Sequence, residues 1–302
     1  MNSTVHEPFP PDALWSEREP LRDDDAPSHH PAAAGLDAVA STLLIPLAAR
    51  AHGDAMFPLQ ALGDVSAPRL LNALKSDVSH YLADRASVYG VLARTQRFRS
   101  IALKFFERSP RSTGVSLGAG LGHYFQWLDR GTNHWIDADL PEVTALRERL
   151  LPATDEGRRN AAVDLTRPGW WQRLGLPSGR REAPVLLICE GVLMYLEPAQ
   201  VQAVLREVGE CAPPGSRLLL DALCWLAVGR AHRHPSVRHT GAQFRWGPRH
   251  WNELTAPHVR LRLDREHRVM EGYGLPHSVM APLFRFATGV PFYAVADIGV
   301  DA

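Results

Sequence analysis

A glycine-rich turn and three acidic residues carry the chemistry that this sequence offers. The turn, Gly118-Ala119-Gly120-Leu121-Gly122, follows a short apolar run, Thr113 to Leu117. Glycines at alternate positions let the backbone turn tightly and let a ligand lie directly against main-chain N–H groups. Asp139, Asp164 and Glu190 each stand at the end of a run that predicts a strand. Because the carboxyl ends of parallel strands meet at one edge of a sheet, the pattern predicts a cofactor site at that edge.

Two cofactor classes meet this pattern to different degrees. Asp139 follows the loop by about 20 residues, the separation at which an acid in a βαβ unit binds ribose hydroxyls. A dinucleotide site also needs a third glycine at the helix start, and the residues after Gly122 do not supply it at the usual spacing. S-adenosylmethionine needs acceptors for ribose, adenine and ammonium, and a cation for its carboxylate. Acids at successive strand ends favour S-adenosylmethionine, with a nicotinamide-dependent reductase as the more distant alternative.

Strand and helix patterns alternate along the chain in an order that would position these residues. Pro141 and Pro198 stand at the starts of predicted helices, where proline is common. The apolar run Val185 to Cys189 is typical of a strand buried on both faces of a parallel sheet. We therefore predict an α/β fold with a doubly wound, mostly parallel, Rossmann-like sheet whose last run is an edge strand. The predicted strands span residues 113–117, 135–139, 160–166, 184–190, 216–221 and 292–298.

The region before the glycine turn divides into a tail and a set of helices. Residues 1–34 are rich in proline, alanine and acids, which predicts a flexible tail, and residues 35–302 are predicted to form a single domain. The pair His29-His30 in the tail has no partner at ligand spacing, so no metal site is predicted. Helical periodicity over residues 41–50, 68–82 and 86–106 predicts extra N-terminal helices that could cap the cofactor cleft.

The composition limits the possible partners of the protein and the compartment in which it is expected. The formal net charge is zero, so overall charge indicates neither a nucleic-acid nor a membrane partner, and no apolar run reaches membrane length. Three cysteines, Cys189, Cys211 and Cys224, form no CxxC pair and are odd in number, which predicts a cytoplasmic protein without disulfides. Residues 230–249 are rich in arginine and histidine; we predict a solvated loop there, with contact to an anionic substrate as the alternative.

Six motifs occur in an order that resembles the leucine carboxyl methyltransferase family. The resemblance covers roughly residues 36 to 300 and is closest to the bacterial branch that includes tetracenomycin-type polyketide O-methyltransferases. The motifs are Thr42-Leu-Leu-Ile-Pro-Leu-Ala-Ala-Arg50, Ala93-Arg-Thr-Gln-Arg-Phe98, Val115-Ser-Leu-Gly-Ala-Gly-Leu-Gly122, Asp139-Leu-Pro-Glu-Val143, Val163-Asp-Leu-Thr166 and Glu190-Gly-Val-Leu-Met-Tyr195.

The resemblance implies a class I methyltransferase fold that uses S-adenosylmethionine to methylate a carboxylate of a small molecule, such as a polyketide or another secondary metabolite. It also implies the cofactor contacts by position. These are Arg94 with the cofactor carboxylate, Gly118 and Gly120 with the methionine part, Asp139 with ribose, Asp164 and Leu165 with adenine, and Glu190 with the amino group.

The nature of the acceptor decides what catalysis requires. A carboxylate is already ionised at neutral pH, so in-line attack on the methyl group needs no general base, whereas a hydroxyl acceptor, the first alternative, would need one. His123 and Tyr195 are candidates to orient the substrate. Family members usually continue the loop as Gly-Leu-Asp-Thr-Arg, and this chain has Gly122-His123-Tyr124 in place of the last three residues. That departure leaves a second alternative, a partner protein that binds the cofactor without catalysing a reaction.

Overall fold

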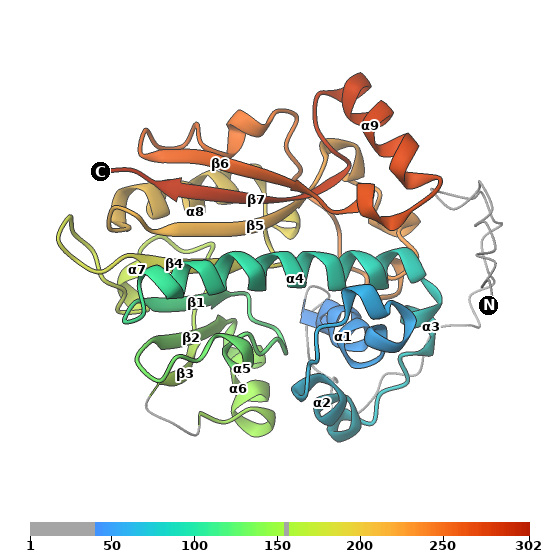
Figure 1. The fold of residues 1–302 in the computed structure, drawn as a ribbon, viewed down its shortest axis with the longest axis horizontal. Helices are drawn as coiled ribbons and strands as arrows, with labels where there is room; N and C mark the ends of the chain where they lie inside the picture. The colour runs from blue at the N-terminus through green and yellow to red at the C-terminus, as the bar shows by residue number, and fades with distance from the viewer. Residues whose placement is uncertain (1–39, 154–156) are drawn as a thin grey trace, which may run out of the picture.

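The computed structural model describes residues 40–153 and 157–302 (Figure 1). The predicted tail, residues 1–34, lies outside the described residues, and the single domain over residues 35–302 stays a prediction. Among the described residues, no helix is both long enough and apolar enough to span a membrane.

A seven-stranded sheet forms the centre of the structure, in the order β3-β2-β1-β4-β5-β7-β6. Strands β1 to β5 pair in parallel, and β7 runs antiparallel to both of its neighbours. The chain moves outward from β1 to β3 and then returns to β4, so the order reverses between β1 and β4, where open α/β sheets bind ligands. The predicted doubly wound, mostly parallel sheet is confirmed. The strands are β1 (Thr113–Leu117), β2 (His134–Asp139), β3 (Arg158–Ala162), β4 (Val185–Cys189), β5 (Arg217–Leu223), β6 (Leu261–Arg268) and β7 (Tyr293–Val300).

The prediction that the last strand lies at an edge is wrong. β7 is paired on both sides, with β5 and with β6, and all but its first residue are buried. The edge strand on that side of the sheet is β6, which the sequence analysis did not predict. Six of its eight residues are charged or histidine, and its register shifts between Leu263 and Arg265, so it lacks the apolar alternation that predicts a strand.

Helices cover both faces of the sheet. Strand β4 is buried on both faces, as its continuous apolar run predicts. Leu186 and Ile188 pack in the cluster that contains α4 residues, and Leu187 packs in the cluster that contains α8 residues. Trp170 and Trp171 are fully buried in that second cluster, as expected for packing residues. The helices are α1 (Leu44–Met56), α2 (Ser66–Leu74), α3 (Ser79–Ala83), α4 (Arg85–Arg108), α5 (Phe125–Leu128), α6 (Pro141–Leu150), α7 (Trp170–Arg173), α8 (Pro198–Cys211) and α9 (His277–Thr288).

The N-terminal helices and α9 gather beyond the carboxyl ends of the parallel strands (Figure 1). The long helix α4 begins in this region, beside α3, and runs back along the sheet. Asp84 caps the start of α4 by accepting a hydrogen bond from the Ser87 N–H. The predicted extra N-terminal helices are thus present, and they stand at the end of the sheet where the glycine turn lies.

Candidate active site

A cavity of about 740 Å³ opens at the carboxyl ends of β1 and β4. Side chains or backbone atoms of every predicted cofactor-binding residue line it, and so does the substrate candidate Tyr195. The predicted residues found in the cavity wall are Arg94, Gly118, Gly120, Asp139, Asp164, Leu165, Glu190 and Tyr195. His123 is not part of the described wall.

The glycine turn has the geometry that its sequence predicts. Gly118 and Gly120 have φ angles of +66° and +51°, in the left-handed region that glycine adopts without strain. A Cβ on Gly118 would lie 2.3 Å from Cγ2 of Val192, so a larger residue there would force Val192 or the turn to shift. Asp139 fixes the turn from the next strand, because its Oδ2 accepts the Gly120 N–H at 2.7 Å. Burial raises the pKa of Asp139, against the lowering effect of this backbone hydrogen bond.

The residues after β3 form a second acidic corner of the cavity. Asp164 lies two residues beyond the end of β3, so the strand is shorter than predicted and the acid belongs to the following loop. Its Oδ1 accepts hydrogen bonds from the N–H of Thr166 at 2.9 Å and from its hydroxyl at 2.6 Å. The pKa of Asp164 is lowered, chiefly by the hydrogen bond from the Thr166 hydroxyl, so the carboxylate stays ionised. The neighbouring Leu165 is buried and supplies an apolar surface beside it.

Arg94 lies between two carboxylates. Its Nε donates to Glu190 Oε1 at 2.8 Å, and its Nη1 donates to Asp221 Oδ2 at 2.9 Å and to the Tyr293 hydroxyl at 2.8 Å. The Tyr293 hydroxyl in turn donates to Asp221 at 2.7 Å. Burial acts to lower the pKa of Arg94, but Tyr293, Glu190 and Asp221 raise it well above its ordinary value. The guanidinium is therefore a fixed cation at the end of the sheet.

Two members of this cluster were not predicted. Asp221 is fully buried within the apolar strand β5, and an acid in such a run is the one sequence signal that points to it. Tyr293 begins β7 and carries no comparable signal, because aromatic residues are common in strands.

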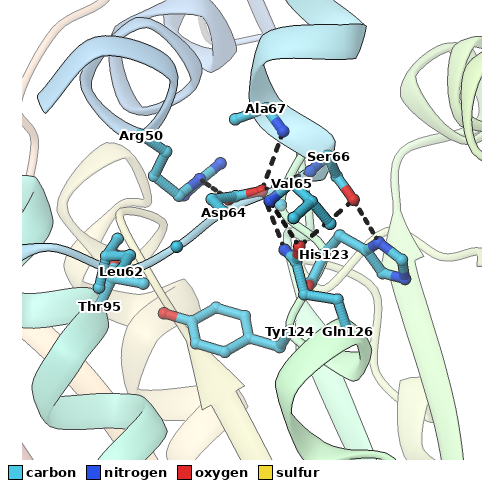
Figure 2. A network of polar contacts seen from close by, with 12 residues as sticks. Arg50, Leu62, Asp64, Val65, Ser66, Ala67, Thr95, His123, Tyr124 and Gln126 are labelled. Atoms are coloured by element: carbon cyan, nitrogen blue, oxygen red, sulfur yellow. Dashed lines mark hydrogen bonds and ion pairs between the residues drawn. The ribbon is translucent and has the colours of Figure 1, made fainter. Parts of the chain in front are cut away.

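The departure from the family loop pattern has a structural counterpart. Tyr124, at the position where the resemblance implies an arginine, donates its hydroxyl to Glu190 Oε2 at 2.5 Å. Arg50 of α1 supplies a positive charge instead, with its Nη1 3.7 Å from Glu190 Oε1. Its Nε lies 3.4 Å from Asp64 Oδ2 (Figure 2). Burial acts to raise the pKa of Glu190, and Arg94 and Arg50 outweigh it, so the pKa is lowered. Arg50 was not predicted as a site residue, although it ends the first family motif.

His123 lies in a polar network that ties the loop to α2 (Figure 2). Its Nδ1 is 2.9 Å from the Ser66 hydroxyl, and its carbonyl oxygen accepts a hydrogen bond from Gln126 Nε2 at 2.8 Å. Burial, followed by the charge of Arg158, lowers the pKa of His123 to about 4, so the ring is neutral at pH 7. These contacts give His123 a structural explanation that does not involve the cavity.

The rest of the cavity wall is mostly apolar. It comes from α1, from residues 234–244 and from the segment around α9. The predicted solvated loop at residues 230–249 therefore contributes in part to the cavity. Burial raises the pKa of Tyr195 to about 12, so its hydroxyl stays protonated. The apolar wall includes Ile45, Val237, Phe244, Met270, Met280, Ala281, Phe284 and Phe292.

Fold and site together define a class I S-adenosylmethionine-dependent methyltransferase. The sheet has an antiparallel seventh strand beside β5, the glycine turn follows β1, and an acid ends β2. The residues also fit the cofactor physically. The site has a glycine-lined cradle that a Cβ would fill, an ionised acid, Asp164, at the predicted adenine contact, and a fixed cation beside an ionised carboxylate. Among the described residues, no cluster of three or more histidine, cysteine or acidic side chains could hold a metal.

Comparison with known proteins identifies the family. Residues 33–209 match the model of the leucine carboxyl methyltransferase family, and this chain belongs to that family. A tetracenomycin polyketide synthesis O-methyltransferase from Streptomyces glaucescens is 32% identical over 213 residues, 70% of this chain and 76% of that protein. An S-adenosyl-L-methionine-dependent methyltransferase from Gibberella zeae is 27% identical over 225 residues, 68% of this chain and 74% of that protein.

A solved structure supports the fold. The crystal structure of a putative methyltransferase from Thermobifida fusca matches with a TM-score of 0.52 and 16% identity, over 84% of this chain and 94% of that one. The predicted resemblance and the predicted cofactor, S-adenosylmethionine, are thus confirmed at the level of the family.

Proposed function

We propose that this chain methylates a carboxylate of a small-molecule acceptor, a polyketide or another secondary metabolite, by direct in-line transfer. The observation that carries the proposal is the continuity of the cavity. The same cavity is lined by the glycine turn with its acids and by the apolar side chains Met280, Phe284 and Phe292. A cofactor and an apolar organic acceptor can therefore lie side by side within it. The family description and the Streptomyces relative support a carboxyl or polyketide acceptor.

The cofactor roles follow from the contacts. Arg94 retains further N–H groups beyond those that bind Glu190 and Asp221, so it can hold the cofactor carboxylate. Glu190, kept ionised by Arg94 and Arg50, accepts from the cofactor ammonium group.

The remaining predicted residues hold the other parts of the cofactor. The backbone at Gly118 and Gly120 lines the methionine part, and Asp139 takes the ribose hydroxyls. Asp164 and Leu165 bind adenine, the first by its ionised carboxylate and the second by its apolar surface.

Catalysis consists mainly of positioning. When bound, S-adenosylmethionine supplies an electrophilic methyl group on a sulfonium. The chain holds the acceptor carboxylate in line with that group and excludes water with its apolar wall. A carboxylate needs no proton removed, so the protonated Tyr195 contributes a hydrogen-bond donor and no base. His123, outside the described cavity wall, has no part in this arrangement.

The bond formed in the product tests the proposal. The chain is incubated with methyl-labelled S-adenosylmethionine and a panel of aromatic and aliphatic acids, each paired with a phenol of the same skeleton. We expect labelled products from acids, and mild alkali should release the label as methanol. An alkali-stable ether from the phenols, with no ester from any acid, would establish the hydroxyl-directed alternative. Binding of S-adenosylhomocysteine without transfer to any compound would favour the non-catalytic partner protein.

We also propose a cytoplasmic location. All three cysteines, Cys189, Cys211 and Cys224, are free thiols, which supports a reducing compartment. Fractionation of the source cells, with the chain detected by antibody, tests this.

A further inference from the structure

His234 belongs to the cavity wall but to none of the predicted site residues. It follows a 3-10 turn, Ala231–Arg233, in the connection between β5 and β6. Its ring packs edge-on against Phe244, with 5.9 Å between the ring centroids, and Phe244 also packs against Tyr195 at 5.7 Å. The histidine is thus part of the apolar end of the cavity, in the segment 230–249 for which contact with an anionic substrate was the alternative to a solvated loop.

Backbone hydrogen bonds fix which ring nitrogen of His234 carries the proton. The N–H groups of Ser236 and Val237 each donate to Nδ1, both at 3.3 Å. An imidazole nitrogen that accepts hydrogen bonds carries no proton, so the proton of the neutral ring is on Nε2. Burial lowers the pKa of His234, and the nearby Asp84 opposes this effect without overcoming it. His234 therefore offers a single, oriented N–H donor.

Asp84, the acid that acts on the His234 pKa, makes its hydrogen bonds with serine groups. Asp84 has its carboxylate engaged by the N–H of Ser87 at 3.2 Å, by the Ser87 hydroxyl at 2.5 Å and by the Ser236 hydroxyl at 2.8 Å. Within residues 40–153 and 157–302, the hydrogen bonds of the His234 ring are the two that Nδ1 accepts, and Nε2 makes none. A polar donor in an apolar wall, without an acceptor in the described chain, is suited to an oxygen of a ligand.

The surrounding side chains define the rest of that ligand. Phe284 of α9 and Phe292 pack edge to face, with 5.7 Å between their ring centroids, and both line the cavity together with Met270 and Met280. Aromatic rings favour flat apolar partners through stacking, and methionine adapts to irregular ones.

We propose that His234 binds the acceptor through its Nε2–H, which donates to an oxygen of the acceptor carboxylate, and that the acceptor is a flat, aromatic acid packed against the phenylalanines. This inference rests on the proposed carboxyl methylation. Because Nε2 already carries a proton and Nδ1 is held by the backbone, His234 is a donor and does not serve as a base. It thus differs from the histidine that a hydroxyl-directed enzyme would need.

A binding experiment tests this without methyl transfer. Calorimetry measures the affinity of the full chain, saturated with S-adenosylhomocysteine, for 2-naphthoate and for 2-methylnaphthalene, which lacks the carboxylate. His234→Leu removes the donor, and His234→Gln keeps an N–H at about the reach of Nε2. We expect His234→Leu to lower the affinity for 2-naphthoate by about 10- to 100-fold, the effect of losing a hydrogen bond to a charged group. Its affinity for 2-methylnaphthalene should change by less than about twofold, and His234→Gln should recover most of the lost affinity.

The other outcomes overturn the proposal. Equal weakening of both probes would mean that His234 only shapes the wall, and unchanged 2-naphthoate affinity in His234→Leu would mean that it makes no contact. Failure of the unsubstituted chain to bind 2-naphthoate, with S-adenosylhomocysteine bound, would rule out the aromatic-acid site. Because no product is formed in this assay, these results are separate from the ester test of the proposed function. S-adenosylhomocysteine affinity in each variant shows that it is folded.

Discussion

Tyr124→Phe tests whether the unusual glycine-loop sequence supports cofactor binding. The substitution removes one oxygen atom and leaves the buried ring in place, so packing against Trp127 and Trp135 is retained. What is lost is the 2.5 Å hydrogen bond to Glu190 Oε2. Arg94 still holds the other carboxylate oxygen at 2.8 Å. Glu190 therefore stays ionised, and its carboxylate becomes free to rotate about that remaining contact.

The expected loss of stability follows from the charged character of the Tyr124–Glu190 hydrogen bond. A hydrogen bond to a charged group contributes about 1.5–3 kcal/mol, and this one is buried. We expect Tyr124→Phe to lower the free energy of unfolding by roughly 2 kcal/mol. The affinity for a ligand falls by less, because binding depends only on how far the hydrogen bond orients Glu190 toward the cofactor ammonium group. The expected loss of affinity is about 5- to 20-fold for S-adenosylhomocysteine.

Two ligands separate orientation of Glu190 from general damage. S-adenosylhomocysteine has the amino-acid end, and 5′-methylthioadenosine has the adenosine and the thioether without it. Calorimetry should show weaker binding of the first and unchanged binding of the second in Tyr124→Phe. Tyr81→Phe is the matched control, since it removes a hydroxyl from another buried tyrosine, on α3 and outside the described cavity wall. Equal loss for both ligands, or no loss for either, would refute the assigned role of Tyr124.

Three further predictions concern the cofactor half of the site. Asp139→Ala should lower the affinity for S-adenosylhomocysteine, measured by calorimetry, by about 100-fold or more. The substitution removes the carboxylate that accepts from the ribose and also holds the glycine turn. Unchanged affinity would contradict the ribose assignment. Gly118→Ala should lower the melting temperature and reduce the affinity for S-adenosylhomocysteine by at least about 10-fold. The alanine Cβ would lie 2.3 Å from Val192, and the φ angle at this position is +66°. Normal affinity would show that the loop can shift. Glu190 should contribute an acid limb to S-adenosylhomocysteine affinity that lies below the ordinary carboxyl pKa of 4.5, because its pKa is lowered in the fold and its charge disappears only below that value. The pKa of Asp139 is raised by burial, so its own acid limb lies at higher pH. A Glu190→Gln variant should lack the Glu190 limb, and a loss that begins near neutral pH would point to another group.

The sequence predicted the part of the site that depends on strand ends. Asp139 and Glu190 follow recognisable strands, and the carboxyl ends of parallel strands coincide whatever the loops between them do. Arg50 and Tyr293 could not be found in that way, because they reach the site from α1 and β7 through packing between distant segments.

The C-terminal elements were harder to predict for local reasons. β6 mixes charged and apolar residues without alternation. α9 contains Pro282 and carries exposed apolar side chains such as Leu283, so its pattern does not show one buried face. The position of β7 inside the sheet depends on pairing with β6, which no pattern within β7 itself can indicate.

The Arg94 cluster has a consequence for how the chain becomes active during synthesis. Arg94 is held by groups at positions 190, 221 and 293, so the cluster joins segments separated by up to 199 residues. The family model, by contrast, ends at residue 209. A nascent chain that has just completed the family region has all the predicted cofactor residues but neither Asp221 nor Tyr293, and its Arg94 lacks two of its partners. We expect a chain stalled on the ribosome to gain tight cofactor binding only after β7 has emerged and entered the sheet between β5 and β6.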